Sequence, residues 1–127
     1  MTAHRVLVVD DEPQILRFLK PSLGAAGYDV IAAINGAAAL KAAATQAPDI
    51  ILLDLGLPDM DGKDVIAELR TWSKVPIIVL SARDREAEKI AALDLGADDY
   101  VNKPFGIGEL MARLRTALRH EIGRAHV

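Results

Sequence analysis

The sequence predicts an α/β fold, (βα)5, in which five strands form an open, doubly wound parallel sheet with helices on both faces. Three short apolar runs rich in β-branched residues, at 6–9, 50–53 and 77–80, are typical of strands that helices bury on both sides. A stretch of helical length follows each of these runs, and glycine or proline separates many of the segments. This alternation of segments favours a parallel sheet.

Two weaker strand candidates, at 28–32 and 99–101, complete the five strands. Helices are expected at about 13–26, 36–46, 62–72, 84–95 and 106–121. The last helix has the clearest pattern, because its apolar residues recur on one face: Ile107, Leu110, Met111, Leu114 and Leu118. Pro21 interrupts the first helical pattern, and we expect it to kink that helix or to end its first half.

Composition limits the classes of protein to which the chain can belong. Its 127 residues suit one domain, and the absence of cysteine excludes a disulfide framework, a thiolate zinc site and a cysteine nucleophile. A net charge of −3 is a poor match to a protein that coats nucleic-acid phosphates. No apolar run has the length of a membrane span, and the amino terminus lacks a signal-peptide layout. We expect a soluble, cytoplasmic domain at residues 1–121, with 122–127 as the start of a linker or a disordered tail.

Acidic residues gather where the predicted strands end. The first strand runs into Asp10, Asp11 and Glu12, and the third runs into Asp54. Ligands bind outside the carboxyl ends of the strands in such sheets, so these carboxylates should converge at one edge. Carboxylates that crowd together need a cation or raised pKa values. Oxygen ligands without histidine or cysteine favour Mg²⁺, with Mn²⁺ as an alternative.

Asp54 is the candidate nucleophile, because a carboxylate can attack phosphorus and form an aspartyl phosphate. The fourth strand ends at Ser81 and Ala82, and the fifth runs into Lys103. Mg²⁺ and Lys103 would neutralise phosphoryl oxygens, and the Ser81 hydroxyl would donate a hydrogen bond to another oxygen. The small side chain of Ala82 would leave access to the pocket. The pattern therefore predicts a site that hosts a phosphoryl group.

Four segments together carry a resemblance to a known family. They are residues 8–12 (VVDDE), 53–62 (LDLGLPDMDG), 79–82 (VLSA) and 96–105 (GADDYVNKPF). In this order and spacing, the chain resembles the receiver domains of two-component response regulators over essentially its full length. The resemblance implies a flavodoxin/CheY-like fold with strand order 2-1-3-4-5.

The roles known in that family fall on matching residues here. The resemblance implies that Asp54 accepts a phosphoryl group from a sensor histidine kinase and that Lys103 contacts this group. It further implies that Asp11 binds the metal directly, that Asp10 acts mainly through water, and that Asp54 and the Gly56 carbonyl complete the protein ligands. Such a domain catalyses its own phosphotransfer and a slow dephosphorylation, and is not otherwise an enzyme.

Ser81 and Tyr100 match the family's switch pair, in which the hydroxyl moves toward the phosphoryl group and the aromatic ring turns inward. Serine stands here in place of the commoner threonine, which keeps the hydroxyl and removes a methyl group. The Lys103–Pro104 bond matches one that is usually cis in the family, which costs little before proline.

Residues 82–83, and the run from 89–94 through 108–110, resemble the winged-helix transcription-factor (OmpR/PhoB-like) subfamily. Within that subfamily, residues 54–58, 75–83 and 103–110 are most similar to the potassium-transport (Kdp) regulators. In that subfamily phosphorylation favours a homodimer through the fourth helix, the fifth strand and the fifth helix. The matching residues are Lys89, Ile90, Leu93, Asp98, Asp99, Glu109, Ala112 and Arg113. Arg119 or His120 would supply a basic residue near the end of the last helix. Contact with DNA would need a further carboxyl-terminal domain, so we expect an excised receiver in preference to a stand-alone one, without a membrane partner.

Simpler interpretations remain open for several residues. Asp10 to Glu12 could be an acidic cap of the first helix, and Tyr100 could be an ordinary strand aromatic. Residues 59–62 begin like a calcium loop, but Arg70 stands where that loop needs glutamate, so a turn and helix-cap role is favoured.

Two other functions compete with the receiver hypothesis. A phosphatase of the haloacid-dehalogenase type would need a second aspartate two residues after Asp54, where Gly56 stands. A flavodoxin-like cofactor binder would need a phosphate-cradling loop after the first strand, where acidic residues would repel phosphate unless a metal intervened. Because the sequence lacks the motif that each alternative needs, the receiver hypothesis is favoured.

Overall fold

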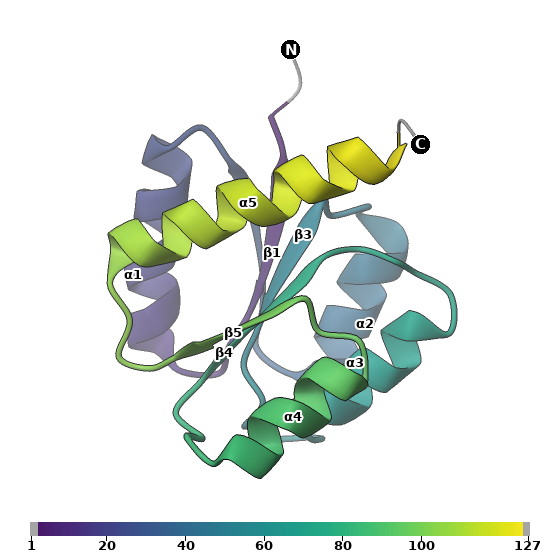
Figure 1. Ribbon diagram of the computed structural model, residues 1–127. Coiled ribbons are helices and arrows are strands. Elements are labelled where there is room, and N and C mark those ends of the chain that lie inside the picture. The colour runs from purple at the N-terminus through teal and green to yellow at the C-terminus, as the bar shows by residue number, and fades with distance from the viewer. Residues whose placement is uncertain (1–2, 126–127) are drawn as a thin grey trace.

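The computed structural model describes residues 3–125, which form a five-stranded parallel sheet with helices on both faces (Figure 1). The strands are β1 (Arg5–Val9), β2 (Asp29–Ala33), β3 (Ile50–Leu53), β4 (Ile77–Ser81) and β5 (Asp99–Asn102). The helices are α1 (Pro13–Ala25), α2 (Gly36–Thr45), α3 (Gly62–Arg70), α4 (Glu86–Asp94) and α5 (Ile107–Ala125). The strand order is β2-β1-β3-β4-β5, so the predicted fold class and order are confirmed.

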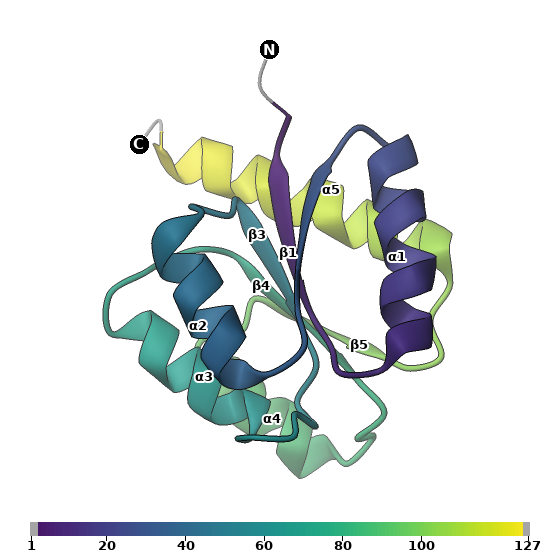
Figure 2. The same cartoon turned by 180° about the vertical axis from the view of Figure 1, so that it is seen from behind.

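The two faces of the sheet have separate apolar layers. Along β1, Leu7 and Val9 pack with α2, α3 and α4, whereas Val6 and Val8 pack with α1 and α5. Figure 1 shows α5 crossing in front of the strands, and Figure 2 shows α2 on the opposite, near side. Both faces are covered, which explains why β1, β3 and β4 appear in the sequence as continuous apolar runs.

Helix α5 buries the apolar face that its sequence predicts. Leu110, Leu114 and Leu118 are buried against the sheet, and Ile107 and Met111 pack at the margin of the same layer. The helix continues to Ala125, past the end expected near residue 121. No helix among the described residues combines the length and the apolar character that crossing a membrane requires.

Helix α1 continues through Pro21 to Ala25, so the expected end at the proline is wrong and only the kink stays a prediction. Leu19 and Leu23, on either side of Pro21, are both fully buried against the sheet. Pro21 itself is exposed. The apolar packing of both halves therefore outweighs the local preference of proline to end a helix.

The loop between β3 and α3 is fixed by its aspartates. Asp59 accepts hydrogen bonds from the backbone N–H groups of Gly36 (2.7 Å) and Ala37 (2.9 Å), at the start of α2. These bonds lower the pKa of Asp59. Asp61 caps α3 by accepting from the N–H of Lys63 at 2.9 Å. The turn and helix-cap role predicted for this segment is thus confirmed.

Candidate functional site

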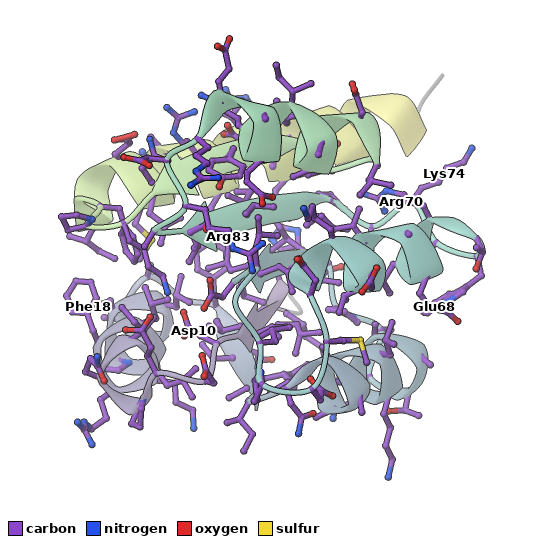
Figure 3. All side chains as sticks on the ribbon, turned by 90° about the horizontal axis from the view of Figure 1, so that it is seen from below. Asp10, Phe18, Glu68, Arg70, Lys74 and Arg83 are labelled. Carbon is purple, nitrogen blue, oxygen red and sulfur yellow. The ribbon has the colours of Figure 1, made fainter. Side chains whose placement is uncertain are left out.

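A pocket of about 310 Å³ opens at the carboxyl edge of the sheet. Figure 3 looks onto this edge and shows Asp10 and Arg83 near its centre, whereas Arg70 and Lys74 lie away from it. We call this hollow the sheet-edge pocket, and its lining comes from the last residue of β4 and from the loops that follow β1, β3, β4 and β5. The lining residues are Asp11, Glu12, Asp54, Gly56, Ser81, Ala82, Arg83 and Lys103.

Strand register explains why residues far apart in the sequence meet here. Val9 pairs with Leu53 across β1 and β3, so the residues that follow, Asp10 and Asp54, leave the sheet side by side. The backbone supports this arrangement, because the N–H of Asp54 donates to the Val9 carbonyl at 2.9 Å. On the other side of β4, the N–H of Lys103 donates to the Ser81 carbonyl at 2.8 Å.

Asp54 is 6% exposed and has few polar partners. Its Oδ1 accepts a long hydrogen bond of 3.3 Å from the N–H of Gly56, and its Oδ2 lies 3.5 Å from the Lys103 ammonium. Burial raises the pKa of Asp54 above its ordinary value, and the positive charge of Lys103 only partly opposes this effect. The carboxylate is therefore short of compensating charge, which a bound cation would supply.

Asp10, Glu12 and Asp54, which we call the acidic cluster, place carboxylate oxygens within 4.8 Å of one another. Asp10 is 1% exposed, and its Oδ1 accepts from the N–H of Glu12 at 2.9 Å. Asp11 is exposed and lines the pocket outside this cluster. The sequence placed Glu12 among the strand-end acids but gave it no role at the metal, and the structure brings it into the cluster with Asp10 and Asp54.

Lys103 is the counterion of the acidic cluster. Its Nζ donates to Asp10 Oδ2 and Glu12 Oε1, both at 2.9 Å. Burial alone would lower the pKa of Lys103, but these two hydrogen bonds and the neighbouring negative charges raise it, so the ammonium stays charged. The Lys103–Pro104 bond is cis, as the resemblance implies.

The donor set fits a divalent cation. Three carboxylates and one ammonium leave two formal negative charges in the cluster. The ligands on offer are all carboxylate or carbonyl oxygens, which suit Mg²⁺ and Mn²⁺ better than softer metals.

Ser81 and Tyr100 both contact the backbone of Arg83. Ser81 is 1% exposed, and its Oγ accepts from the N–H of Arg83 at 3.0 Å. The Tyr100 ring is buried, and its hydroxyl donates to the Arg83 carbonyl at 2.6 Å. Sequence reasoning named Arg83 only as part of a subfamily motif, and its place two residues after Ser81 was the available signal.

The family model for the response regulator receiver domain matches residues 6–115. The chain belongs to this family. It is 57% identical over 122 residues to the transcriptional regulatory protein KdpE of Mycobacterium tuberculosis, covering 96% of this chain and 54% of that protein. It is 60% identical over 114 residues to the KDP operon transcriptional regulatory protein KdpE of Escherichia coli, covering 90% and 51%. The receiver thus spans about half the length of these relatives.

Solved receiver structures have the same fold. The beryllofluoride-activated receiver domain of Klebsiella pneumoniae RstA aligns with a TM-score of 0.88 at 34% identity, covering 91% of this chain and 99% of that one. A CheY-like receiver protein from Methanospirillum hungatei aligns with a TM-score of 0.92 at 25% identity, covering 97% and 99%. Receiver domains bind Mg²⁺ at an acidic site, and the acidic cluster is a group of carboxylates that could bind a metal ion.

The residues expected at a dimer interface lie on α4, β5 and α5 of this receiver, except Asp98, which immediately precedes β5. Ile90 and Leu93 are exposed on α4, as are Lys89 and Ala112 on their helices. Within the chain, Arg113 pairs with Asp99 at 3.0 Å and Glu109 at 3.3 Å, and Asp98 pairs with Arg70 at 3.2 Å. Arg119 is exposed, and the side chain of His120 lies outside those described.

Proposed function

We propose that Asp54 is the phosphoacceptor of this receiver and that its phosphorylation by a sensor histidine kinase controls transcription. The observation that carries the proposal is a buried carboxylate in an open pocket, 3.5 Å from Lys103 and beside two further acids. The similarity to KdpE proteins supports control of potassium-transport genes. DNA binding would belong to an output domain outside these residues.

In the proposed reaction, an Asp54 carboxylate oxygen attacks the phosphorus of a phosphohistidine. The new P–O bond forms as the P–N bond breaks, and the electron pair leaves with the donor imidazole, so Asp54 becomes an acyl phosphate. Lys103 holds one phosphoryl oxygen, and the Ser81 hydroxyl donates to another. Water later cleaves the acyl phosphate slowly, and this self-catalysed cycle is the domain's whole chemistry.

Asp11, Asp10, Asp54 and the Gly56 carbonyl would hold Mg²⁺, with Glu12 close enough to take part. When bound, the metal neutralises negative charge as the phosphoryl group approaches. The chain's own residues do the positioning: strand register sets Asp54 beside Asp10, and the backbone of Lys103 is fixed to Ser81.

Ser81 and Tyr100 would transmit the effect of phosphorylation from Asp54 to the rest of the domain. The Ser81 oxygen accepts from the N–H of Arg83, which leaves the hydroxyl proton available for a phosphoryl oxygen, and the Tyr100 hydroxyl donates to the carbonyl of Arg83. The two side chains are therefore joined through one peptide segment. We infer that a rearrangement of this segment on phosphorylation reaches α4, β5 and α5 and favours a homodimer.

Mass spectrometry after treatment with phosphoramidate and Mg²⁺ tests the phosphoacceptor. One phosphoryl group, labile to hydroxylamine, is expected on the wild type and on Asp84→Asn, a control at an exposed aspartate outside the pocket lining. Asp54→Asn should take up none, and equal labelling of that variant would contradict the proposal.

Calorimetry tests the metal site. It should show Mg²⁺ binding to the wild type that Asp11→Ala abolishes, and Mn²⁺ binding at the same site.

A further inference from the structure

Arg83 stands between β4 and α4 and is held at several points. Its N–H donates to Ser81 Oγ and its carbonyl accepts from Tyr100, so the backbone has little freedom. Arg83 lines the sheet-edge pocket, and its guanidinium reaches across to the β3–α3 loop, where Nη2 lies 3.5 Å from the Leu55 carbonyl. The side chain thus lies next to the residue that follows Asp54.

The guanidinium belongs to an ionic group that we call the Arg83 network. Arg83 Nη1 lies 3.0 Å from Asp61 Oδ2 and 3.7 Å from Glu88 Oε2. Lys63 contacts the same two acids, at 4.0 Å from Asp61 and 2.7 Å from Glu88. The network therefore has two cations and two anions, and each anion touches both cations.

We propose that Arg83 is a second cationic contact for the phosphoryl group, held beside the pocket by Asp61 and Glu88 until that group arrives. The inference rests on the proposed role of Asp54. A phosphoryl group adds about 1.5–2 negative charges and three acceptor oxygens. Lys103 offers one ammonium, which already donates to Asp10 and Glu12. A guanidinium presents several donors in a planar fork that fits phosphate oxygens.

The network can release Arg83 without leaving a carboxylate unpaired. Asp61 keeps its hydrogen bond from the N–H of Lys63, and Glu88 keeps the Lys63 ammonium at 2.7 Å. The pairs of Arg83 with these acids are partly exposed, so breaking them costs little. A phosphoryl group in the pocket can therefore displace Asp61 and Glu88 from the Arg83 guanidinium at a small cost in free energy.

Titration with beryllofluoride and Mg²⁺, followed by ¹⁹F NMR, measures the contact on the full chain. Arg83→Gln should weaken beryllofluoride binding about tenfold or more, as expected for the loss of a charged hydrogen bond, and Arg83→Lys should restore part of it. Arg85→Gln is the matched control, because Arg85 is exposed and does not line the pocket. It should bind as the wild type does.

Asp61→Asn distinguishes a phosphoryl contact from a structural role. Asparagine can still cap α3 but no longer holds Arg83 by charge, so beryllofluoride binding should tighten a few-fold, opposite in sign to Arg83→Gln. Weaker binding by both variants, or no effect of Arg83→Gln, would overturn the inference while leaving Asp54 as acceptor. A wild type that binds no beryllofluoride would overturn the role of Asp54 and this inference with it.

Discussion

Gly62, the first residue of α3, lies directly against the backbone of the proposed phosphoacceptor. A Cβ at this position would be 2.5 Å from the Asp54 carbonyl oxygen and 2.7 Å from Leu55 Cα. Both are backbone atoms at the buried end of β3, so neither can move aside as a flexible side chain would. Gly62→Ala should therefore displace α3 or the segment that carries Asp54.

The size of the effect follows from two opposing terms. Forcing one extra carbon into a packed site costs about 1–3 kcal/mol, and replacing glycine by alanine in a helix returns up to about 1 kcal/mol. The expected net loss is about 1–2 kcal/mol in the free energy of unfolding. Because urea slopes for small domains are about 1–3 kcal/mol per molar, the midpoint should fall by roughly 1 M.

Urea unfolding followed by circular dichroism measures this loss, and phosphoramidate labelling reports the displacement of Asp54 as a slower rate. Gly108→Ala is the matched control, since Gly108 is the second residue of α5 and a Cβ there meets nothing within 4 Å. That variant should be as stable as the wild type or more so. If Gly62→Ala were equally stable and were labelled at the wild-type rate, the close approach would not constrain the site.

Three further predictions concern other parts of the receiver. Ala47 has φ +46°, a left-handed conformation that costs alanine about 1–2 kcal/mol. Glycine relieves this cost but has more freedom in the unfolded chain, which offsets part of the gain, so Ala47→Gly should raise the urea midpoint only slightly. Burial raises the pKa of Asp54 above its ordinary value of 3.8, so at pH values above 3.8 the ionised side chain lowers the stability of the folded state. Without metal, Asp54→Asn should therefore raise Tm near neutral pH, and this gain should vanish in acid. Leu93 and Leu95 are each 39% exposed, but only Leu93 belongs to the proposed interface. Sedimentation should show that beryllofluoride shifts the wild type and Leu95→Ala toward a dimer but leaves Leu93→Ala monomeric, and equal effects of the two variants would discard that interface.

The apolar runs were sufficient to predict β1, β3 and β4, because strands buried on both faces leave no alternation to misinterpret. The order of the strands came only with the resemblance, since a run of valine and isoleucine does not identify its neighbours. Local rules failed where packing opposed them. Pro21 favours the end of a helix, but the burial of Leu19 and Leu23 keeps α1 continuous.

At the site, the sequence predicted that the strand-end residues converge, but not which of the acids after β1 join the cluster or which atoms touch. The convergence of Asp10, Asp54 and Lys103 follows from the rule that parallel strands end at one edge. Which acid turns toward the cluster depends on the turn after β1, and the structure brings Glu12 into the group with Asp10. The contacts of Arg83 depend on a loop that no periodic pattern describes.

The observed contact of Lys103 with Asp10 and its proposed contact with a phosphoryl oxygen cannot be made independently. Before any phosphoryl group arrives, its ammonium is bonded to Asp10, a carboxylate that is almost completely buried. Leaving a buried carboxylate without its partner costs about 3–5 kcal/mol, so Lys103 cannot turn fully to a phosphoryl oxygen unless another cation replaces it at Asp10. A divalent ion among the same carboxylates provides that replacement. If Lys103 contacts the phosphoryl group as proposed, Mg²⁺ binding would be a condition for phosphorylation as well as an aid to it, because the metal would free the lysine for that contact.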